Sequence, residues 1–230
     1  MPTEEYERVL PHMEVISLPF KQHLYEPNEP IEHLYFPNIG IISMVAVMRD
    51  GSVVEVATVG NEGMIGTPIV LGADRVTAET FVQVPGEGLR MKVDVFKKEV
   101  PPGSSLHNLL LRYIQALMNQ LMQSVACNRL HSIEQRCCRW LLLTQDRVDS
   151  DEFPLTQEFL SQMLGVRRAS VSEVAAKLQK EGLINYHRGR LKILDRPGLE
   201  AGSCECYRVI EQGYKRLLGS HMMSGKSPII

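Results

Sequence analysis

The hydrophobic pattern of the chain changes from strand-like to helical near residue 103. Between about residues 14 and 95, short β-branched runs are separated by proline and glycine. Two of the runs meet at Asp50-Gly51, and Asp-Gly between apolar runs is a strong hairpin signal. Many short strands at this spacing are typical of a small barrel or jelly roll. Residues 1–103 are therefore predicted to form a β-roll domain.

A long helix is predicted over residues 104–131, after Pro101-Pro102-Gly103. Ser104 or Ser105 can cap its first turn. Apolar and polar residues follow at alternating spacings of four and three, as in paired helices. Further apolar residues widen this face, so the helix can pack on its own domain, on a second copy of the chain, or on both. We interpret it as a dimerisation helix, with the contact residues Leu106, Leu110, Tyr113, Leu117, Gln120 and Ser124.

A third unit is predicted over residues 132–218, and its centre carries a helix-turn-helix pattern. Thr156 can cap a helix that runs to Leu164. Gly165 can end that helix in a left-handed conformation, and a second helix begins near Arg168. Two helices cross tightly only where their contact residues are small or apolar and the turn residue lacks a Cβ. The residues that meet these demands are Leu160, Ser161, Leu164, Gly165, Val166, Val171 and Val174.

With that face buried, the second helix presents a polar face that suits DNA. The first residues of such a helix reach base edges in the major groove. Arginine can grip guanine O6 and N7, and glutamate can accept a hydrogen bond from cytosine N4. The stretch "EGLINYHRGRLKILD" then predicts two strands joined at Arg188-Gly189-Arg190, which form a wing. The predicted DNA-binding residues are Thr156, Gln157, Arg167, Arg168, Ala169, Ser170, Ser172, Glu173, Lys177, Arg188 and Arg190.

Charge is distributed unevenly along the chain. Residues 1–100 carry 8 Lys/Arg against 15 Asp/Glu, whereas residues 101–230 carry 17 against 12. Residues 156–196 alone carry 8 Lys/Arg and 4 Asp/Glu. This distribution indicates that the second half of the chain meets a polyanion such as DNA.

The order β-roll, long helix and winged helix-turn-helix resembles the Crp/Fnr family of bacterial transcription regulators. The resemblance covers about residues 14–215 and is most specific in "PLTQEFLSQMLGVRRASVSEVAAKLQKEGLI". The stretch "YEPNEPIEHLYFPNIGIIS" is similar to the start of the family's cyclic-nucleotide-binding-like domain. The resemblance implies an α+β fold and a homodimer on a near-palindromic operator, in contact with RNA polymerase. Because Ala169 stands where many members have glutamate, the operator sequence of the best-known members does not carry over.

The stretch "GNEGMIGTPIVLGADRVTAETF" corresponds to the effector pocket of the family but departs from its phosphate cassette. Thr67 stands where a glutamate would hold a ribose, and Val76 stands where an arginine would pair with the phosphate. Losing that arginine removes a charge-assisted contact to an anion, which argues against cyclic AMP. The resemblance places the pocket at Gly63, Gly66, Thr67, Val76 and Thr77.

The sequence also bears on two other cofactors that the family uses, an iron–sulfur cluster and haem. The iron–sulfur branch uses an N-terminal cysteine cluster, and no cysteine precedes Cys127, which argues against that cofactor. Haem stays open because His12, His23 and His33 lie in the first half. An unknown small molecule, or no effector at all, also stays open.

The sequence shows no catalytic or metal-binding motif. The five cysteines include no C-x-x-C pair, so we expect neither a disulfide framework nor a zinc ribbon. Cys204-x-Cys206 has no evident ligand partners, and we expect inert thiols and no enzyme activity. Two alternatives stay open: a redox sensor that works through cysteines, and a small-molecule module whose helical half contacts proteins.

The two ends of the chain add little to this interpretation. The acidic start predicts no signal peptide, and no apolar run approaches the length of a membrane span. We therefore expect a cytoplasmic protein without a membrane partner. Residues 219–230 contain Gly-Ser-His-Met, which looks like a cloning remnant, and are treated as a tail.

Overall fold

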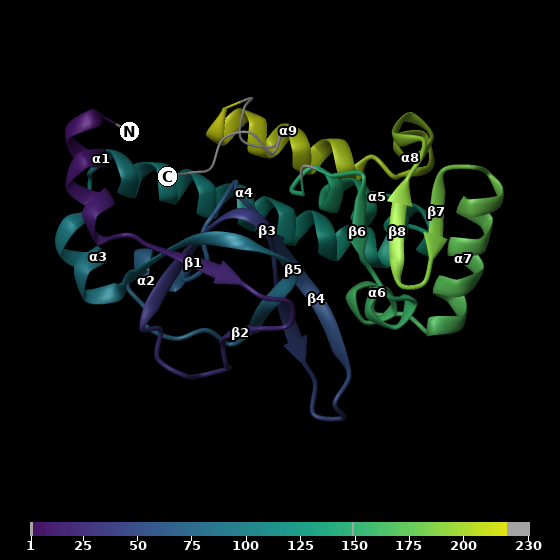
Figure 1. The fold of residues 1–230 in the computed structure, drawn as a ribbon, viewed down its shortest axis with the longest axis horizontal. Helices are drawn as coiled ribbons and strands as arrows, with labels where there is room; N and C mark the ends of the chain where they lie inside the picture. Colours follow the sequence, from purple (N-terminus) through teal and green to yellow (C-terminus); the bar gives the residue numbers. More distant parts are fainter. Residues whose placement is uncertain (1, 149, 220–230) are drawn as a thin grey trace.

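The computed structural model describes residues 2–148 and 150–219, and the fold is α+β as expected (Figure 1). A β-sheet unit comes first, a long helix crosses the molecule, and a helical unit with a small sheet follows. No helix among the described residues is both long and apolar enough to cross a membrane. The proposed tail lies outside these residues except for Gly219.

The first unit is a rolled antiparallel sheet with the order β1-β5-β3-β4 and with β2 beside β5. The Asp50-Gly51 hairpin is confirmed, since it joins β3 to β4 and Gly51 has a φ of +80°. Shifts in register between β3 and β5 bend these two strands around the core. The strands are β1 (Glu14–Leu18), β2 (His23–Tyr25), β3 (His33–Val47), β4 (Val53–Val59) and β5 (Glu79–Lys92).

Short helices close the ends of the roll, and one of them caps the long helix. The Glu5 carboxylate of α1 accepts hydrogen bonds from the backbone N–H groups of Ser105 and Leu106, at 3.1 and 2.9 Å. These are free donors of the first turn of a helix, where a negative charge is also favourable. The helical segments are α1 (Thr3–Val9), η1 (Leu10–His12), α2 (Thr67–Val70) and α3 (Val93–Glu99).

The long helix α4 spans Ser105–Leu130 and begins at the predicted cap, Ser104. Its inner face packs on the sheet unit of its own chain. The Tyr113 hydroxyl donates to the Met64 carbonyl at 3.2 Å, and a Cβ on Gly63 would lie 2.2 Å from the Tyr113 ring. This close approach requires glycine at position 63.

The residues predicted for the dimer contact are wrong as a set, because they face the interior of the chain. Four apolar members and Gln120 are buried, and Ser124 is partly buried. The two polar members contact α5 and the turn after it: Gln120 accepts a hydrogen bond from Arg147 at 3.2 Å, and Ser124 accepts one from Arg139 at 3.3 Å. The residues that the structure removes from the predicted dimer contact are Leu106, Leu110, Tyr113, Leu117, Gln120 and Ser124.

The C-terminal unit is a helical bundle with a three-stranded sheet of order β6-β8-β7. A capping box between Ser132 and Gln135 starts its first helix. Its last helix, α9, lies along α4 (Figure 1). The elements are α5 (Ile133–Gln145), β6 (Glu152–Pro154), α6 (Gln157–Leu164), α7 (Arg168–Lys180), β7 (Ile184–His187), β8 (Arg190–Ile193), α8 (Arg196–Gly202) and α9 (Cys206–Leu218).

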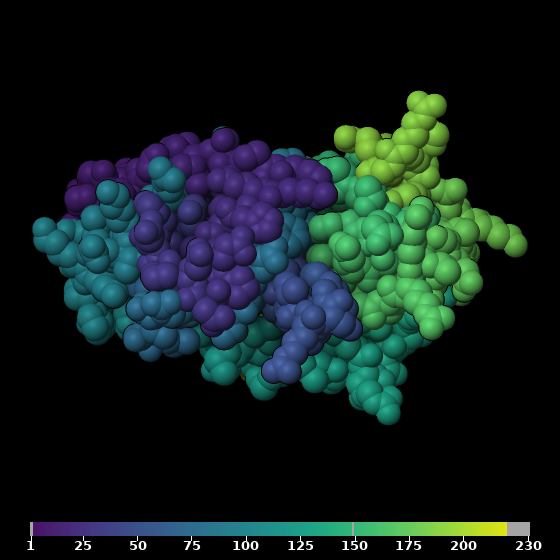
Figure 2. Space-filling view, turned by 90° about the horizontal axis from the view of Figure 1, so that it is seen from below, coloured from purple at the N-terminus to yellow at the C-terminus, as the bar shows by residue number. Residues whose placement is uncertain are grey.

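The two units pack directly against each other, which Figure 2 shows as the contact between the purple sheet region and the green helical region. The Phe81 and Phe159 rings meet edge to face with centroids 6.2 Å apart. Trp140 of α5 donates to the Glu55 carboxylate of β4 at 2.8 Å. A buried ion pair joins Arg147 to Glu62 at 2.8 Å. Apolar packing, a hydrogen bond and an ion pair thus hold the helical unit on the sheet.

Candidate nucleic-acid interface

The helix-turn-helix is built by local signals at its caps. The Thr156 hydroxyl accepts from the backbone N–H of Phe159 at 3.1 Å, which caps α6. Gly165 ends α6 with a φ of +62°, a conformation that glycine adopts without steric cost. Helix α7 begins at Arg168, as predicted.

The predicted packing face of the motif is buried, or nearly so. The contact between α6 and α7 is fixed further by a hydrogen bond from the Ser172 hydroxyl to Gln157 Oε1 at 2.6 Å. Leu160, Ser161, Leu164 and Val171 are buried, whereas Val166 and Val174 are partly buried. The motif therefore presents one fixed polar face.

That polar face is accessible. Arg167, Arg168, Ala169 and Glu173 are exposed at the start of α7, and Ser170 is partly exposed. Among the residues described by the structure, Arg167 and Arg168 form no ion pair. Both guanidinium groups are therefore available to an external acceptor.

Two other predicted DNA contacts are already paired within the chain. Lys177 Nζ lies 2.6 and 2.8 Å from the Glu134 carboxylate oxygens, and Arg190 pairs with Glu152. The Lys177 and Arg190 side chains are 52% and 61% exposed. Exposed pairs of this kind contribute little to stability because water screens them, so a phosphate can displace the carboxylate.

The wing is held against the segment that leads into α6. Arg188 and Gly189 form its turn, with φ values of +48° and +75°, as a tight hairpin requires. The Gly189 carbonyl accepts from the Leu155 N–H at 2.8 Å, and the Tyr186 hydroxyl donates to the Leu155 carbonyl at 2.6 Å. Burial raises the pKa of Tyr186, and the nearby charge of Arg168 opposes that rise. Both hydrogen bonds hold the wing on Leu155, just ahead of the helix-turn-helix, and Arg168 is the α7 arginine whose charge reaches the wing.

The residues predicted for an effector pocket do not form one polar site. Val76 is buried in the apolar core and Gly63 packs on Tyr113, whereas Thr77 is exposed. Gly66 and Thr67 lie at the start of the single-turn helix α2. Arg75 is exposed and donates to the Asn28 carbonyl, so it does not replace the arginine that the cassette lacks.

The three histidines considered for haem are divided between two places. His23 and His33 line one surface pocket on the sheet unit, and His23 Nδ1 lies 3.1 Å from Glu26 and 3.2 Å from Glu79. His12 lies beside Glu99 at 4.0 Å.

All five cysteines are buried. Burial raises the pKa of the Cys137 thiol, and it raises the pKa of Cys138 to about 12. A peroxide-sensitive cysteine needs an accessible thiol of low pKa, so these two side chains do not favour the redox alternative.

Helix α4 also has an exposed apolar stripe, which the sequence analysis did not separate from the buried one. Leu111, Met118, Met122 and Val125 are exposed apolar residues on the outer face of the helix. Together with exposed Gln115 and Arg129 they repeat at spacings of four and three. The signal was present in the sequence, but two parallel repeats on one helix do not reveal which of them faces outward.

Comparisons with known proteins agree with this architecture. Residues 135–201 match the Crp-like helix-turn-helix domain family. The fold matches that of TTHB099, a CRP-family transcriptional regulator from Thermus thermophilus, with a TM-score of 0.68, 20% identity, and coverage of 83% of this chain and 96% of that one. FixK2 from Bradyrhizobium japonicum matches with a TM-score of 0.70, 14% identity, and coverage of 84% and 98%.

A third solved structure is CLP from Xanthomonas campestris, which is described as a c-di-GMP responsive global regulator. It matches with a TM-score of 0.66 and 15% identity over 84% of this chain and 100% of that one. No curated protein shows significant sequence similarity to the chain.

Proposed function

We propose that this chain, which carries a Crp-like helix-turn-helix domain on the fold of the Crp/Fnr family of transcription regulators, is a DNA-binding transcription regulator that reads a near-palindromic operator as a homodimer. The observation that carries this proposal is the accessible start of α7, where Arg167 and Arg168 are exposed and lie without ion-pair partners among the described residues. A regulator of this kind acts in the cytoplasm, and family resemblance adds RNA polymerase as a partner.

Helix α7 would enter the major groove with its first turn. Arg168 and Glu173 are on its exposed face, where arginine reads guanine and glutamate reads cytosine. Lys177, the wing arginines Arg188 and Arg190, and the start of α6 at Thr156 would contact phosphates, which position the protein without reading sequence.

The outer stripe of α4 supports the homodimer. Exposed leucine, methionine and valine at heptad spacing are costly in water and are typical of a helix pair. The stripe continues into a groove between α4 and α9 that is lined by Met122, Gln123, Val209 and Gln212. Two chains paired along this stripe would present two copies of α7, which is the arrangement that a palindromic operator requires.

We further propose that cyclic AMP does not control this protein. Val76 is part of the apolar core, and Arg75 is held at the surface by the Asn28 carbonyl. A cyclic phosphate therefore has no buried arginine to pair with at the family's position.

Two substitutions test the roles assigned to α7. Fluorescence anisotropy would measure the affinity of each variant for a selected operator and for a scrambled duplex of the same length. We expect Arg168→Ala to reduce the preference for the operator roughly ten- to hundred-fold, the value of a lost bidentate base contact. We expect Lys177→Ala to weaken both duplexes to a similar degree, because it loses only a phosphate contact.

Lys98→Ala is the matched control, because Lys98 is 83% exposed on the sheet unit, away from the helix-turn-helix. It should change neither affinity. An unchanged operator preference in Arg168→Ala would show that α7 is not the recognition helix.

A further inference from the structure

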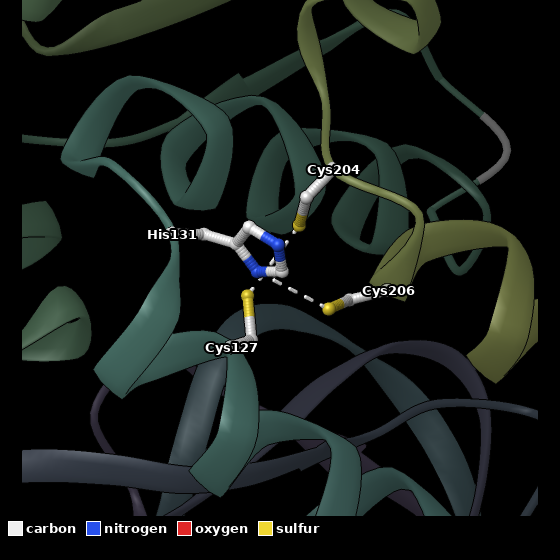
Figure 3. Close-up of side chains that lie close together, drawn as sticks. All are labelled: Cys127, His131, Cys204 and Cys206. Atoms are coloured by element: carbon white, nitrogen blue, oxygen red, sulfur yellow. Dashed lines mark hydrogen bonds between the residues drawn. The ribbon is translucent and has the colours of Figure 1, made fainter.

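Three cysteines and one histidine from two distant parts of the chain converge where α4 ends and α9 begins. Cys127 lies in the last turn of α4 and His131 is its C-terminal cap. Cys204 precedes α9 and Cys206 is its first residue. Figure 3 shows the three sulfur atoms around the imidazole ring. One ligand atom of each residue lies within 4.8 Å of all the others.

The spacing of these atoms fits a four-coordinate metal ion. Cys127 Sγ and Cys204 Sγ are 3.5 Å apart, and Cys206 Sγ and His131 Nδ1 are also 3.5 Å apart. A tetrahedron with Zn–S bonds of about 2.3 Å and Zn–N bonds of about 2.0 Å separates its sulfurs by about 3.8 Å, and sulfur from nitrogen by about 3.5 Å. A small adjustment of side chains would satisfy all four bonds.

The groups around the cluster are those that support metal ligands. His131 Nε2 lies 3.3 Å from the Glu205 carboxylate. A metal-binding histidine usually donates its second ring N–H to a carboxylate in this way, which fixes the tautomer. Gln123 Nε2 donates to Cys206 Sγ at 3.0 Å. Cys127, Cys204 and Cys206 are buried, so the cluster is largely closed to water, as structural zinc sites are.

We propose that Cys127, His131, Cys204 and Cys206 bind one Zn²⁺ ion in a closed tetrahedral site. Three thiolates and one imidazole form a standard ligand set for structural zinc. Zinc with three thiolates carries a net charge of −1, and the guanidinium of Arg139, which is partly engaged with Ser124, is close enough to Cys127 to stabilise negative charge there. Each thiol that binds releases its proton to solvent.

The site would fix the junction between the long helix and the helix-turn-helix. His131 lies in the connection from α4 to α5, and Arg136 of α5 donates to Asn128 at 3.1 Å and to the Leu164 carbonyl. Zinc would hold this connection and the start of α9 together, and so hold α6 and α7 in place. This consequence for DNA binding rests on the proposed function, whereas the metal site itself does not.

Metal analysis of the reduced, full-length protein tests the site. The protein would be produced in zinc-supplemented medium and passed through gel filtration. We expect about one zinc ion per chain for the wild type, with a large loss in Cys206→Ser and in His131→Ala. Cys137→Ser is the matched control, because Cys137 is a buried cysteine outside the cluster, and it should retain its zinc.

Two measurements keep the test valid if a ligand variant fails to fold. Glu205→Gln changes an exposed carboxylate, and it should weaken zinc binding about ten-fold in competition with a chromophoric chelator. Cobalt(II) added to the metal-free wild type should give the strong absorption bands of tetrahedral thiolate coordination.

Other outcomes would overturn the proposal. One is a wild-type protein that holds less than about a tenth of an ion per chain and takes up neither Zn²⁺ nor Co²⁺. The other is full metal retention in both Cys206→Ser and His131→Ala. A Cys127–Cys204 disulfide in a protein that takes up no metal would assign the cluster to redox chemistry instead. Zinc binding in a protein that selects no DNA would leave the metal site intact and overturn only the proposed function.

Discussion

Glu55 is one of the residues that join the two units. Its carboxylate accepts from Trp140 Nε1 at 2.8 Å and from the Ser43 hydroxyl at 2.9 Å. Burial raises the pKa of Glu55 to about 7, although both hydrogen bonds and the charge of Arg139 oppose the rise. The carboxyl group is therefore about half protonated at neutral pH.

This pKa predicts a pH dependence of stability. The ordinary pKa of the group is 4.5, so between pH 4.5 and 7 the folded chain holds a proton that the unfolded chain has lost. The stabilising contribution is complete below pH 4.5, falls as pH rises through 7, and is constant above that. From pH 6 to pH 8 the free energy of unfolding should fall by about 1 kcal/mol more in the wild type than in Glu55→Gln.

Urea unfolding at pH 6 and pH 8 measures the free energy of unfolding of both proteins. All other titrating groups are the same in Glu55→Gln, so the difference between the two proteins isolates the contribution of Glu55. Equal pH dependence in wild type and variant would mean that Glu55 keeps its charge in the folded protein.

At the scale of elements, helix α4 has two apolar faces, one buried on its own chain and one exposed. Its inner face is buried on its own chain, where Gln120 and Ser124 accept hydrogen bonds from the arginines of α5 and the turn after it. Its outer face exposes Met118 and Val125, which are 49% and 73% accessible. The inner face stabilises the fold, and the outer face is the surface on which we propose that a second copy packs.

Val125→Asp should convert the dimer to monomer without unfolding it, because the charge would be buried between two helices without a partner. Analytical ultracentrifugation gives the oligomeric state, and circular dichroism checks the fold. Val15→Asp is the matched control, since Val15 is also 73% exposed but lies on β1. A wild type that is monomeric at high concentration, or a variant that stays dimeric, would contradict the assignment of this face.

Elements whose boundaries are set by neighbouring residues could be predicted from the sequence. Thr156 and Gly165 act on their own neighbours, so the helix-turn-helix could be predicted with its boundaries. The Asp50-Gly51 hairpin is local in the same sense.

Features that depend on packing could not be predicted in this way. The partner of each α4 face depends on where the sheet lies, which helix periodicity does not contain. Cys127 and Cys204 are 77 residues apart, and only the packing of α9 on α4 brings them together. Glu55 is likewise partly covered only because α6 packs on β4 and α5 places Trp140 beside it.

At the scale of the whole molecule, the chain combines an acidic sheet unit with a basic helix-turn-helix unit, and the described contacts hold them together. The buried Arg147–Glu62 pair and the Glu55–Trp140 hydrogen bond cross between the units. The position of α7 is thereby coupled to the sheet unit, which is the arrangement that a regulated DNA-binding protein needs.

We expect this molecule to read DNA sequence as a dimer, as proposed above. Selection of random duplex DNA by the purified full-length protein, at roughly physiological salt and without added ligand, tests it most directly. We expect an enriched palindrome with half-sites about one helical turn apart, and its affinity for the protein should fall steeply as salt rises. No enrichment, together with a weak, salt-independent response to DNA, would contradict it.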